Sequence, residues 1–382
     1  MKKDWTYKKL GEVASFSRGL TYSKHDEAES SENVVLRSNN IDLSSGKLDL
    51  TELKFLKKDY IIPEDKRLKR GSIFICMSNG SKAHLGKVAY IDKDYGYAYG
   101  GFMGQITPNE ELNGRYLHYA LSSPEYKQYI KSLSEGANIN NLKYKDLELF
   151  EIPLPPLSEQ SRIVSRLDAA FGEIEGLKAK AEAQLREART LFQAALTQEM
   201  KPKQGWEEKK LPDISENLDG KRKPVTKKDR TQGIYPYYGA SGIVDYVDDY
   251  LFDDDLLCIS EDGANLLMRT YPIAFPISGK VWVNNHAHVL RFNCMTTQRY
   301  VEYFFAGKKL DEYITGAAQP KLTQKALNNI PIYIPDNIDQ QARIVSRLDA
   351  LSEKVRELEE AQKKVIAECD ALKQALLREV FE

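Results

Sequence analysis

Cysteine is scarce and scattered in this sequence. The four cysteines, Cys76, Cys258, Cys294 and Cys369, form no Cys-x-x-Cys pair, and none has a histidine neighbour at zinc-finger spacing. Structural zinc sites and disulfide bonds are therefore not expected. Cys76 and Cys258 stand inside apolar runs, which is typical of small buried side chains.

Long apolar runs are absent as well. No stretch approaches the roughly 18 consecutive apolar residues of a transmembrane helix, and no apolar signal core follows Met1. We therefore expect a protein that stays in the cytoplasm and has no membrane partner.

An excess of charge of one sign is also missing, because the formal net charge is −1. This total gives no general signal for nucleic acid. Locally, however, residues 201–230 carry ten Lys and Arg against six acids, whereas residues 245–262 carry eight acids and no base. A basic groove is therefore compatible with the neutral total, although a solvated face explains such a run equally well.

Motifs for catalysis are missing too. Residues 79–88 resemble a phosphate-binding loop, but five residues instead of four separate the glycines, and Val88 replaces the Ser or Thr that would hold magnesium. Neither a Gly-x-Gly-x-x-Gly loop nor an Asn-Pro-Pro-aromatic segment occurs. His286 and His288 lack an evident acidic partner, and nothing completes a nuclease centre around the aspartates of residues 248–255. We expect no catalytic residue, no metal and no cofactor on this chain; an enzyme with an unfamiliar centre is the alternative.

What the sequence does have is an internal repeat with a period of about 180 residues. The eight residues 162–169, Arg-Ile-Val-Ser-Arg-Leu-Asp-Ala, recur unchanged at 343–350. Trp5 and Trp206 open corresponding stretches of the two halves. Each half is therefore a variable domain followed by a closely similar helical segment. The expected boundaries are 1–151 and 202–332 for the domains, and 152–201 and 333–382 for the helical segments.

Both variable domains are expected to be α+β. Short runs rich in Val, Ile, Tyr and Phe alternate with Gly, Asn and Ser clusters, which predicts strands joined by turns. Helical windows interrupt this pattern in both halves. The expected strands include residues 33–36, 71–77, 87–91, 234–238, 255–259 and 281–283, and the expected helices cover residues 114–133 and 297–305.

The two helical segments are too long for a globular core. Residues 158–200 contain no proline, so they can form one helix of about 64 Å at 1.5 Å per residue. A heptad assignment gives both segments an apolar seam, and because a whole domain lies between them they can pair as an antiparallel coiled coil with a domain at each end. Packing of each helix on its own domain, or pairing with another chain, is the alternative. The principal seam residues are Ile163, Leu167, Ile174, Leu177, Leu191, Ile344, Leu348, Leu351, Val355, Leu358, Leu372 and Leu376.

Polar and basic clusters around glycines are the remaining functional candidates. Asn and Gln can pair with adenine, Arg and Lys with guanine, and Lys can hold phosphates. Such clusters occur in comparable regions of both halves, which favours DNA reading over ordinary turns. The candidate DNA-binding residues are Arg37, Ser38, Asn39, Asn40, Asn79, Ser81, Lys82, Tyr99, Asn140, Lys143, Lys221, Arg222, Lys223, Tyr238, Ser241, Asn265, Asn285 and Lys321.

Over its full length the chain resembles the specificity subunit of type I restriction-modification enzymes. The resemblance rests on residues 152–160, Ile-Pro-Leu-Pro-Pro-Leu-Ser-Glu-Gln, before the first repeat copy, on residues 339–341 before the second, and on segments 236–242 and 261–264. It implies two domains that each read one half of an asymmetric, split site in double-stranded DNA. It also implies helices that set the unread gap and dock two methyltransferase subunits, which would bind S-adenosylmethionine, while motor-nuclease subunits would join for cleavage. A coiled-coil adaptor that never touches DNA is a further alternative.

Overall fold

A computed structural model describes residues 5–43, 45–135, 141–316 and 318–382. The chain divides into two compact units, residues 1–181 with 364–382, and residues 182–363. Each unit contains one α+β domain together with part of two long helices, α5 (Leu157–Glu199) and α10 (Ile338–Phe381). Both helices lie where the sequence predicts them. No helix in the described part of the chain is long and apolar enough to cross a membrane.

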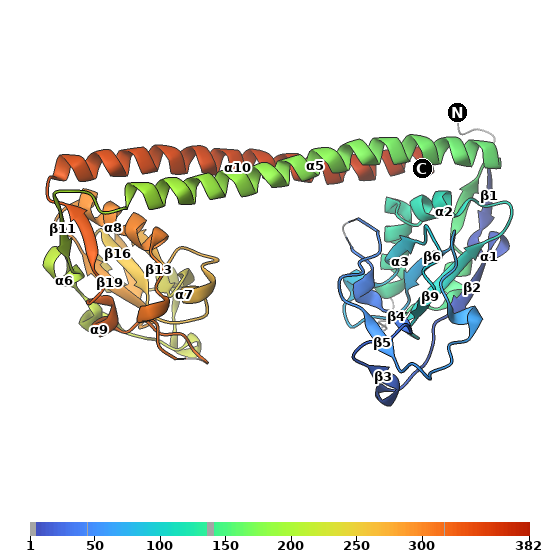
Figure 1. The fold of residues 1–382 in the computed structure, drawn as a ribbon, viewed down its shortest axis with the longest axis horizontal. Helices are drawn as coiled ribbons and strands as arrows, with labels where there is room; N and C mark the ends of the chain where they lie inside the picture. Colours follow the sequence, from blue (N-terminus) through green and yellow to red (C-terminus); the bar gives the residue numbers. More distant parts are fainter. Residues whose placement is uncertain (1–4, 44, 136–140, 317) are drawn as a thin grey trace. The chain divides into compact units, whose positions relative to one another are not determined.

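The first domain mixes short strands and helices (Figure 1). Its strands are β1 (Thr6–Lys9), β2 (Ala14–Arg18), β3 (Glu27–Ala28), β4 (Val34–Leu36), β5 (Lys54–Leu56), β6 (Ile73–Cys76), β7 (Val88–Tyr90), β8 (Ala98–Tyr99), β9 (Met103–Pro108) and β10 (Glu151–Leu154). Its helices are α1 (Leu10–Val13), α2 (Gly114–Ala120), α3 (Pro124–Glu135) and α4 (Tyr144–Glu148), with short 3-10 turns η1 (Lys24–Asp26), η2 (Ser38–Asn40), η3 (Glu64–Lys66) and η4 (Lys82–His84). The single helix expected over residues 114–133 is two helices, because Pro124 lacks the N–H that a continuous helix needs and instead begins α3.

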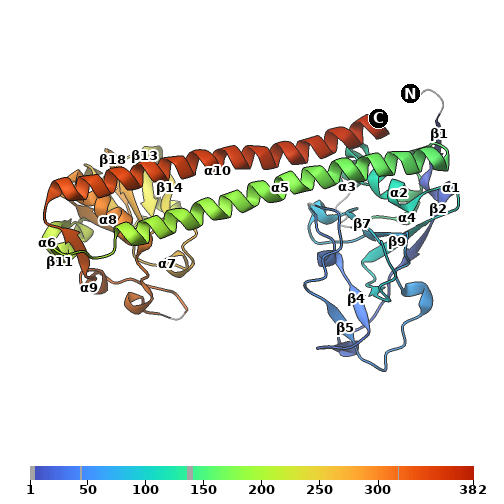
Figure 2. The same cartoon turned by 45° about the horizontal axis from the view of Figure 1, so that its top comes forward.

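The described residues of the first domain form three sheets. One has the order β2-β9-β6-β7, a second has the order β3-β5-β4-β8, and β1 pairs with β10 so that the start of the domain is tied to the strand leading into α5. The second sheet lies on the side of the domain away from α5 (Figures 1 and 2). The apolar core beside α2 includes Ile163 and Leu167 of α5 and Leu377 and Phe381 of α10. The long helices are therefore part of this domain's core.

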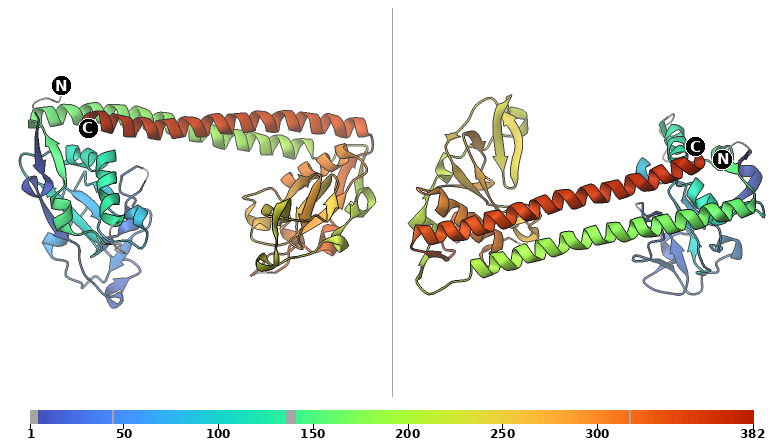
Figure 3. Two further views of the ribbon diagram at one scale, coloured as in Figure 1. Left: turned by 180° about the vertical axis from the view of Figure 1, so that it is seen from behind. Right: turned by 90° about the horizontal axis from the view of Figure 1, so that it is seen from above.

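The second domain is built from a similar succession of strands, short helices and 3-10 turns. Its strands are β11 (Trp206–Lys209), β12 (Glu216–Asn217), β13 (Gln232–Gly239), β14 (Gly242–Val247), β15 (Phe252–Asp253), β16 (Leu256–Ser260), β17 (Ala274–Ile277), β18 (Lys280–Val283), β19 (Ala287–Arg291) and β20 (Ile332–Pro335). Its helices are α6 (Leu211–Ile214), α7 (Asn265–Met268), α8 (Met295–Gly307) and α9 (Gln324–Leu327), with 3-10 turns η5 (Asp219–Lys221), η6 (Lys227–Asp229) and η7 (Asp311–Tyr313). The β13–β14 hairpin projects from this domain (Figure 3).

Two sheets of the second domain repeat those of the first, and the third is similar only at its parallel pair and the neighbouring antiparallel strand. The order β12-β19-β16-β17 matches β2-β9-β6-β7, the pair β11-β20 matches β1-β10, and each domain's other sheet contains one parallel pair, β4 with β8 or β13 with β18. The register agrees as well, since Cys76 lies opposite Met103 and Ser260 lies opposite Ala287. The two α+β domains are therefore structural repeats, although their sequences differ.

An aspartate of the repeated segment fixes each long helix to its own domain. In the first unit, Asp168 of α5 accepts hydrogen bonds from Arg115, at 2.8 Å, and from the hydroxyl of Tyr119. In the second unit, Asp349 of α10 lies 2.7 Å from the guanidinium of Arg299. The donors come from α2 and α8, which share the pattern Arg-Tyr-x-x-Tyr at residues 115–119 and 299–303.

A buried glutamine completes each joint. The amide of Gln160 donates to the carbonyl of Pro155 at 2.8 Å, and that of Gln341 donates to the carbonyl of Pro335 at 2.7 Å. Both side chains are buried. Because a buried amide is costly unless its hydrogen bonds are made, each glutamine fixes the angle at which the domain's last strand enters its helix.

Within each unit the segments of α5 and α10 run antiparallel. In the first unit the ion pairs are Arg166 with Glu379 and Lys178 with Asp370, and in the second they are Arg189 with Glu359 and Arg347 with Glu199. Residues farther along α5 therefore pair with residues that have lower numbers on α10. The helices therefore pair with one another and also dock on their own domains, so both arrangements considered from the sequence occur.

Three residues of the expected seam lie outside it. Leu177 and Leu191 are 54% and 60% exposed, and Leu372 is 49% exposed. On α5 the contact line instead passes through the partly buried Leu185 and Phe192. The expected seam and the observed contact line of α5 both carry large apolar residues, so the periodicity of the sequence does not distinguish them. The docking of the helix on its domain determines which of the two is buried. The other seam residues are buried or partly buried: Ile163, Leu167, Ile174, Ile344, Leu348, Leu351, Val355, Leu358 and Leu376.

Candidate nucleic-acid interface

Several of the polar clusters singled out from the first half's sequence come together at one end of the first domain. The backbone N–H of Gly100 donates to the carbonyl of Leu36 at 2.9 Å, and that of Ser78 donates to the carbonyl of Phe102 at 3.0 Å. Side chains also join the loops, because the amide of Asn79 donates to the hydroxyl of Ser38 at 2.9 Å. We call this surface the first loop cluster; it comprises residues 37–40, 78–82, 100–102 and 141–143.

The second domain has an equivalent surface. The backbone N–H of Asn284 donates to the carbonyl of Tyr238 at 3.1 Å, and that of Glu261 donates to the carbonyl of His286 at 2.9 Å. Asp262 forms a bridge with Lys321, just as Ser78 does with Asn141 in the first domain. This second loop cluster comprises residues 239–241, 261–265, 284–286 and 319–323. Segments far apart in the sequence thus form one comparable surface in each domain.

Most of the candidate DNA-binding residues have exposed or partly exposed side chains. The exposed ones are Asn39, Ser81, Lys82, Lys143, Lys221, Lys223, Ser241, Asn285 and Lys321, and the partly exposed ones are Arg37, Ser38, Asn79, Arg222, Tyr238 and Asn265. Asn140 lies outside the described residues. Lys221 and Lys223 lie at and just after η5, outside the second loop cluster as defined above.

Two candidates are buried and hold the first loop cluster from within. Asn40 accepts a hydrogen bond from the backbone N–H of Arg37 at 2.8 Å, and its amide donates to two backbone carbonyls of residues 49–52. Tyr99 is fully buried, and its hydroxyl lies 2.6 Å from that of Ser17. Neither side chain can reach a base from there. The expectation that they contact DNA is therefore wrong in this structure; they shape the loops.

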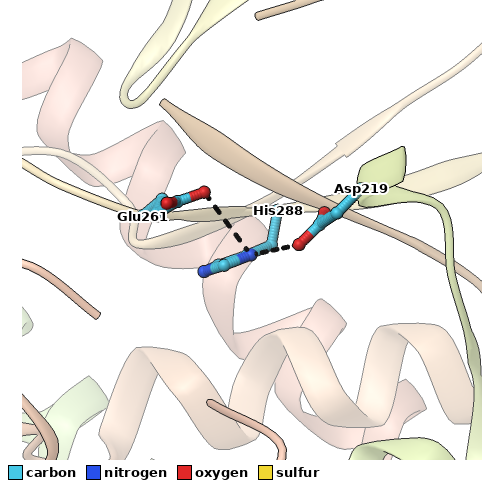
Figure 4. A group of neighbouring side chains, drawn as sticks. All are labelled: Asp219, Glu261 and His288. Atoms are coloured by element: carbon cyan, nitrogen blue, oxygen red, sulfur yellow. Dashed lines mark hydrogen bonds and ion pairs between the residues drawn. The ribbon is translucent and has the colours of Figure 1, made fainter. Parts of the chain in front are cut away.

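Arg222 belongs to a buried ion cluster (Asp219, Arg222, Glu261 and His288). Its guanidinium lies 2.7 Å from Glu261 and 3.3 Å from Asp219. Figure 4 shows both carboxylates directed at the same side of the His288 ring, where Nδ1 lies 2.6 Å from Asp219. The other ring nitrogen, Nε2, lies 2.8 Å from the carbonyl of Leu322. Arg222 is therefore occupied within the protein and not available to a phosphate.

Both carboxyl groups of this cluster are held ionised. Burial raises the pKa of Glu261, but the hydrogen bond from Arg222 and the charge of His288 outweigh it, so that the pKa lies below its usual value. Burial likewise opposes ionisation of Asp219, while the hydrogen bond from His288 and that ring's charge lower its pKa overall. Two buried carboxylates bound by Arg222, His288 and Lys321 form a compact network with directional bonds.

The same cluster supplies the candidate metal ligands. Asp219, Glu261 and His288 offer ligand atoms within 4.8 Å of one another, as the only such group in the described ranges. However, the guanidinium of Arg222 already supplies positive charge between the carboxylates, and both His288 nitrogens have acceptors. The expectation that the two histidines lack acidic partners is wrong: Asp219 pairs with His288, and Asp262 pairs with His286 at 2.8 Å.

A cavity of about 910 Å³ lies in the first unit, between the loop around residue 46, helices α2 and α3, and the long helices. Charged groups at its wall are paired: Glu175 lies 2.6 Å from Lys47 and 3.2 Å from Lys373. His118 also lines it, and burial lowers the pKa of this histidine to about 4, so the ring is neutral near pH 7. The lining of the cavity nevertheless carries seven Lys and Arg side chains against four Asp and Glu.

A second surface of interest is the exposed face of the repeated segment. Of the eight identical residues, those that anchor the helix to its domain have structural reasons to recur. The other four are exposed in both copies, although Arg166 and Arg347 also form the interhelical ion pairs described above: Arg162, Ser165, Arg166 and Ala169 in α5, and Arg343, Ser346, Arg347 and Ala350 in α10. Two arginines, a serine and an alanine are thus presented twice in the same helical pattern.

Comparison with families of known proteins identifies the family of both halves. The model of the type I restriction modification DNA specificity domain matches this chain twice, over residues 2–186 and 203–368. The relatives include the specificity subunits of the type I restriction enzymes StySPI of Salmonella potsdam and EcoKI of Escherichia coli strain K12, each 32% identical over 185 residues, or 48% of this chain and 39% of the relative. The chain thus matches about two fifths of the length of these relatives.

Other comparisons extend over nearly the whole chain. The specificity subunit of the type I restriction enzyme MjaIX of Methanocaldococcus jannaschii is 25% identical over 376 residues, 87% of this chain and 83% of that one. A solved chain from work on assembly and conformational transition of the type I restriction-modification system has a TM-score of 0.76 at 19% identity, covering 98% of this chain and 96% of its own. The HsdS subunit of Thermoanaerobacter tengcongensis has a TM-score of 0.53 at 20% identity, covering 99% and 96%. The fold is therefore shared along the length of the chain.

Proposed function

The chain belongs to the family of type I restriction modification DNA specificity domains, and we propose that it is the DNA-reading subunit of a type I restriction-modification complex. One observation carries the proposal: the two domains share the order of their main sheet and a four-part loop cluster, with different side chains on each. A protein that reads two different half-sites needs a constant frame and variable contacts.

The difference between the loop clusters supports an asymmetric target. The first exposes Asn39, Ser81 and Lys143, whereas the second exposes Ser241 and Lys321 beside Asn285. Hydrogen-bonding groups of these kinds discriminate base pairs through the pattern of donors and acceptors in the major groove. Different sets at equivalent places select different bases. A split site with two unlike halves follows, and we propose that the length of the helices sets the unread gap.

We propose that the chain itself has no catalytic centre and acts by positioning. A methyl donor, S-adenosylmethionine, would bind a partner methyltransferase, and motor-nuclease subunits would join for cleavage. The alternative, an enzyme with an unfamiliar centre, predicts that the isolated chain modifies or cuts DNA when given S-adenosylmethionine or magnesium. A protein that reads genomic DNA works in the compartment that holds it, in keeping with the expected cytoplasmic location.

The exposed face of the repeated segment supports a partner that is present twice. Arg166 and Arg347 also form ion pairs between the long helices, but an external constraint on this exposed face best explains why all four residues recur together. Because Arg162 and Arg166 match Arg343 and Arg347, the two faces would bind the same surface of the same molecule. We propose that this molecule is the methyltransferase subunit, with one copy on each face.

The test is to map methylated bases in host DNA with and without this gene. A chain that reads two half-sites yields a motif of two short, unlike sequences separated by a fixed gap. Replacing residues 1–151 by the corresponding domain of a relative should change one half of the motif and leave the other half and the gap unchanged. A palindromic motif, an uninterrupted motif, or methylation that does not depend on the gene would contradict the proposal.

A further inference from the structure

The turn before β9 and the turn before β19 present one residue each at equivalent positions. Met103 begins β9 opposite Cys76, and Ala287 begins β19 opposite Ser260, in the same register of the same sheet. Phe102 and His286 immediately precede these residues. They therefore occupy the same place in the two loop clusters, although nothing in their sequence neighbourhoods aligns them.

Backbone contacts hold the first of these turns in place. The carbonyl of Phe102 accepts hydrogen bonds from the backbone N–H groups of Met77 and Ser78, both at 3.0 Å. The guanidinium of Arg18 donates to the carbonyl of Gly101 at 3.2 Å. With both carbonyls held, the direction in which the Phe102 side chain leaves the surface is set by the sheet beneath it.

The second turn is held in a corresponding way, and here the buried ion cluster takes part. The carbonyl of His286 accepts a hydrogen bond from the N–H of Glu261 at 2.9 Å. Arg222 donates to the carbonyl of Ala287 at 2.7 Å and reaches that of Asn285 at 3.5 Å. An arginine therefore contacts the carbonyl before the presented residue in both domains, and in the second domain that arginine is fixed by two buried carboxylates.

Packing within the protein does little to explain the positions of the two presented side chains. Phe102 is 72% exposed and has no aromatic neighbour among the described residues, which is an unfavourable place for a large apolar side chain unless it has a partner. The imidazole of His286 is 47% exposed, and its Nδ1 lies 2.8 Å from the carboxylate of Asp262. Asp262 thereby fixes the ring and leaves Nε2 directed away from it, with no hydrogen-bond partner in the part of the chain that the structure describes.

We infer that this position determines base specificity in both half-sites. Phe102 makes an apolar contact, for which the 5-methyl group of thymine is the matching feature of a base edge, and His286 makes a hydrogen bond through Nε2. The inference rests on the proposed function. It adds that equivalent positions hold an apolar side chain in one domain and a hydrogen-bonding side chain in the other. The difference between the two half-sites therefore arises in part from Phe102 and His286.

The test uses the whole chain bound to its methyltransferase subunits. Binding is measured to duplexes in which each base pair of both half-sites is changed one at a time. Phe102→Ala should reduce discrimination at one base pair of the first half-site roughly tenfold and leave the second unchanged. His286→Ala should do the reverse. Phe102→Leu, which keeps an apolar side chain, should retain most of the preference.

Two matched controls separate this role from general loss of an exposed side chain. Ile61, 88% exposed, and Ile234, 79% exposed, lie outside the loop clusters of the first and second domains. Replacing either with alanine should leave every base preference unchanged. Thermal unfolding of all variants checks that the domains are intact, which is expected because the replaced side chains are exposed.

The outcomes distinguish this inference from the function on which it rests. If the unaltered complex has no sequence preference, the proposed function fails. If the complex prefers a split site but Phe102→Ala and His286→Ala change no single base preference, or weaken binding to all duplexes equally, then the inference fails and the proposed function stands.

Discussion

The hydroxyl of Tyr303 on α8 donates a hydrogen bond to the carboxylate of Asp349 on α10 over 2.6 Å. The counterpart in the first unit joins Tyr119 to Asp168 in the same way. Arginines one turn earlier, Arg115 and Arg299, bind the same two carboxylates. The repeated sequence is therefore in large part the sequence of a joint between a domain and its helix.

Removing the carboxylate from one joint should loosen that joint. Asp349→Asn leaves the partly buried guanidinium of Arg299 without its ionic partner and weakens the bond to Tyr303, so the free energy of unfolding should fall by about 1–2 kcal/mol. Urea denaturation measures this loss. Glu360→Gln, an exposed carboxylate changed on the same helix, is the control and should stay within about 0.5 kcal/mol of the unaltered chain. Equal stability of the two variants would contradict the anchoring role.

The observed seam of α5 makes a second prediction, with two leucines of one helix as the matched pair. Leu185→Ala removes a partly buried side chain from the line facing α10, whereas Leu191→Ala removes a largely exposed one. The first should cost about 1–2 kcal/mol of unfolding free energy and the second less than about 0.5 kcal/mol, because an exposed side chain buries little apolar area. The register expected from the sequence predicts the opposite order, so denaturation of the two variants decides between them.

Lys221 and Lys223 should act through phosphates. Both are exposed and flank Arg222. Their replacement by alanine should weaken binding to all duplexes alike, and should reduce the slope of log affinity against log salt by about 0.9 for each phosphate that is no longer neutralised. An unchanged salt slope would argue against this role. Arg222→Ala should behave differently, because it disturbs the turn that carries His286 and so changes base preference in one half-site.

The exposed faces of the repeat should bind one partner each. Arg162→Ala with Arg166→Ala should remove one methyltransferase copy from the complex, Arg343→Ala with Arg347→Ala should remove the other, and the four changes together should remove both. The mass of the assembled complex measures this. Lys180→Ala with Arg186→Ala, which removes two exposed charges from unrepeated positions of α5, is the control and should retain both copies. Retention of both copies by the quadruple variant would exclude these faces as docking sites.

Acid should destabilise the second unit through its ion cluster. The pKa of Glu261 is lower in the folded protein than its unfolded value of about 4.3, so the stability it contributes is present above that pH and is lost as the pH falls through the folded value. Glu261→Gln should therefore be less stable than the unaltered chain at pH 7, and this difference should shrink on acidification below about pH 4. Denaturation at a series of pH values measures the difference. A constant difference across that range would show that ionisation of Glu261 contributes nothing.

The sequence predicts the architecture well because the architecture repeats. Eight identical residues at 162–169 and 343–350 define two equivalent halves, and the absence of proline over 158–200 defines a long helix. The contact between Asp168 and its domain, and the equivalent contact in the second unit, could also have been predicted, since Arg-Tyr-x-x-Tyr occurs at both 115–119 and 299–303. Features of this kind depend on residues that are close together in the chain, so they can be predicted from the sequence.

Contacts between residues that are distant in the chain could not be predicted from the sequence. Glu261 and His288 are far from Arg222 in the chain, so nothing local indicates that they join Asp219 around it and remove it from the surface. The equivalence of Phe102 with His286 appears only after the strand registers are known. The seam position expected for Leu191 was wrong for a related reason. Which apolar face of a helix is buried depends on its neighbour in the fold, and for α5 that neighbour is a folded domain.

The exposure of Phe102 has a consequence for how such a protein can change over generations. A side chain that is 72% exposed contributes little to folding, so most replacements at that position are nearly neutral for stability. Mutation can therefore sample new base contacts there without compensating changes in the core. His286 is less free, because Asp262 holds its ring and Arg222 holds the turn that carries it. The first domain should accordingly acquire new targets by single substitutions, whereas the second should need coordinated ones.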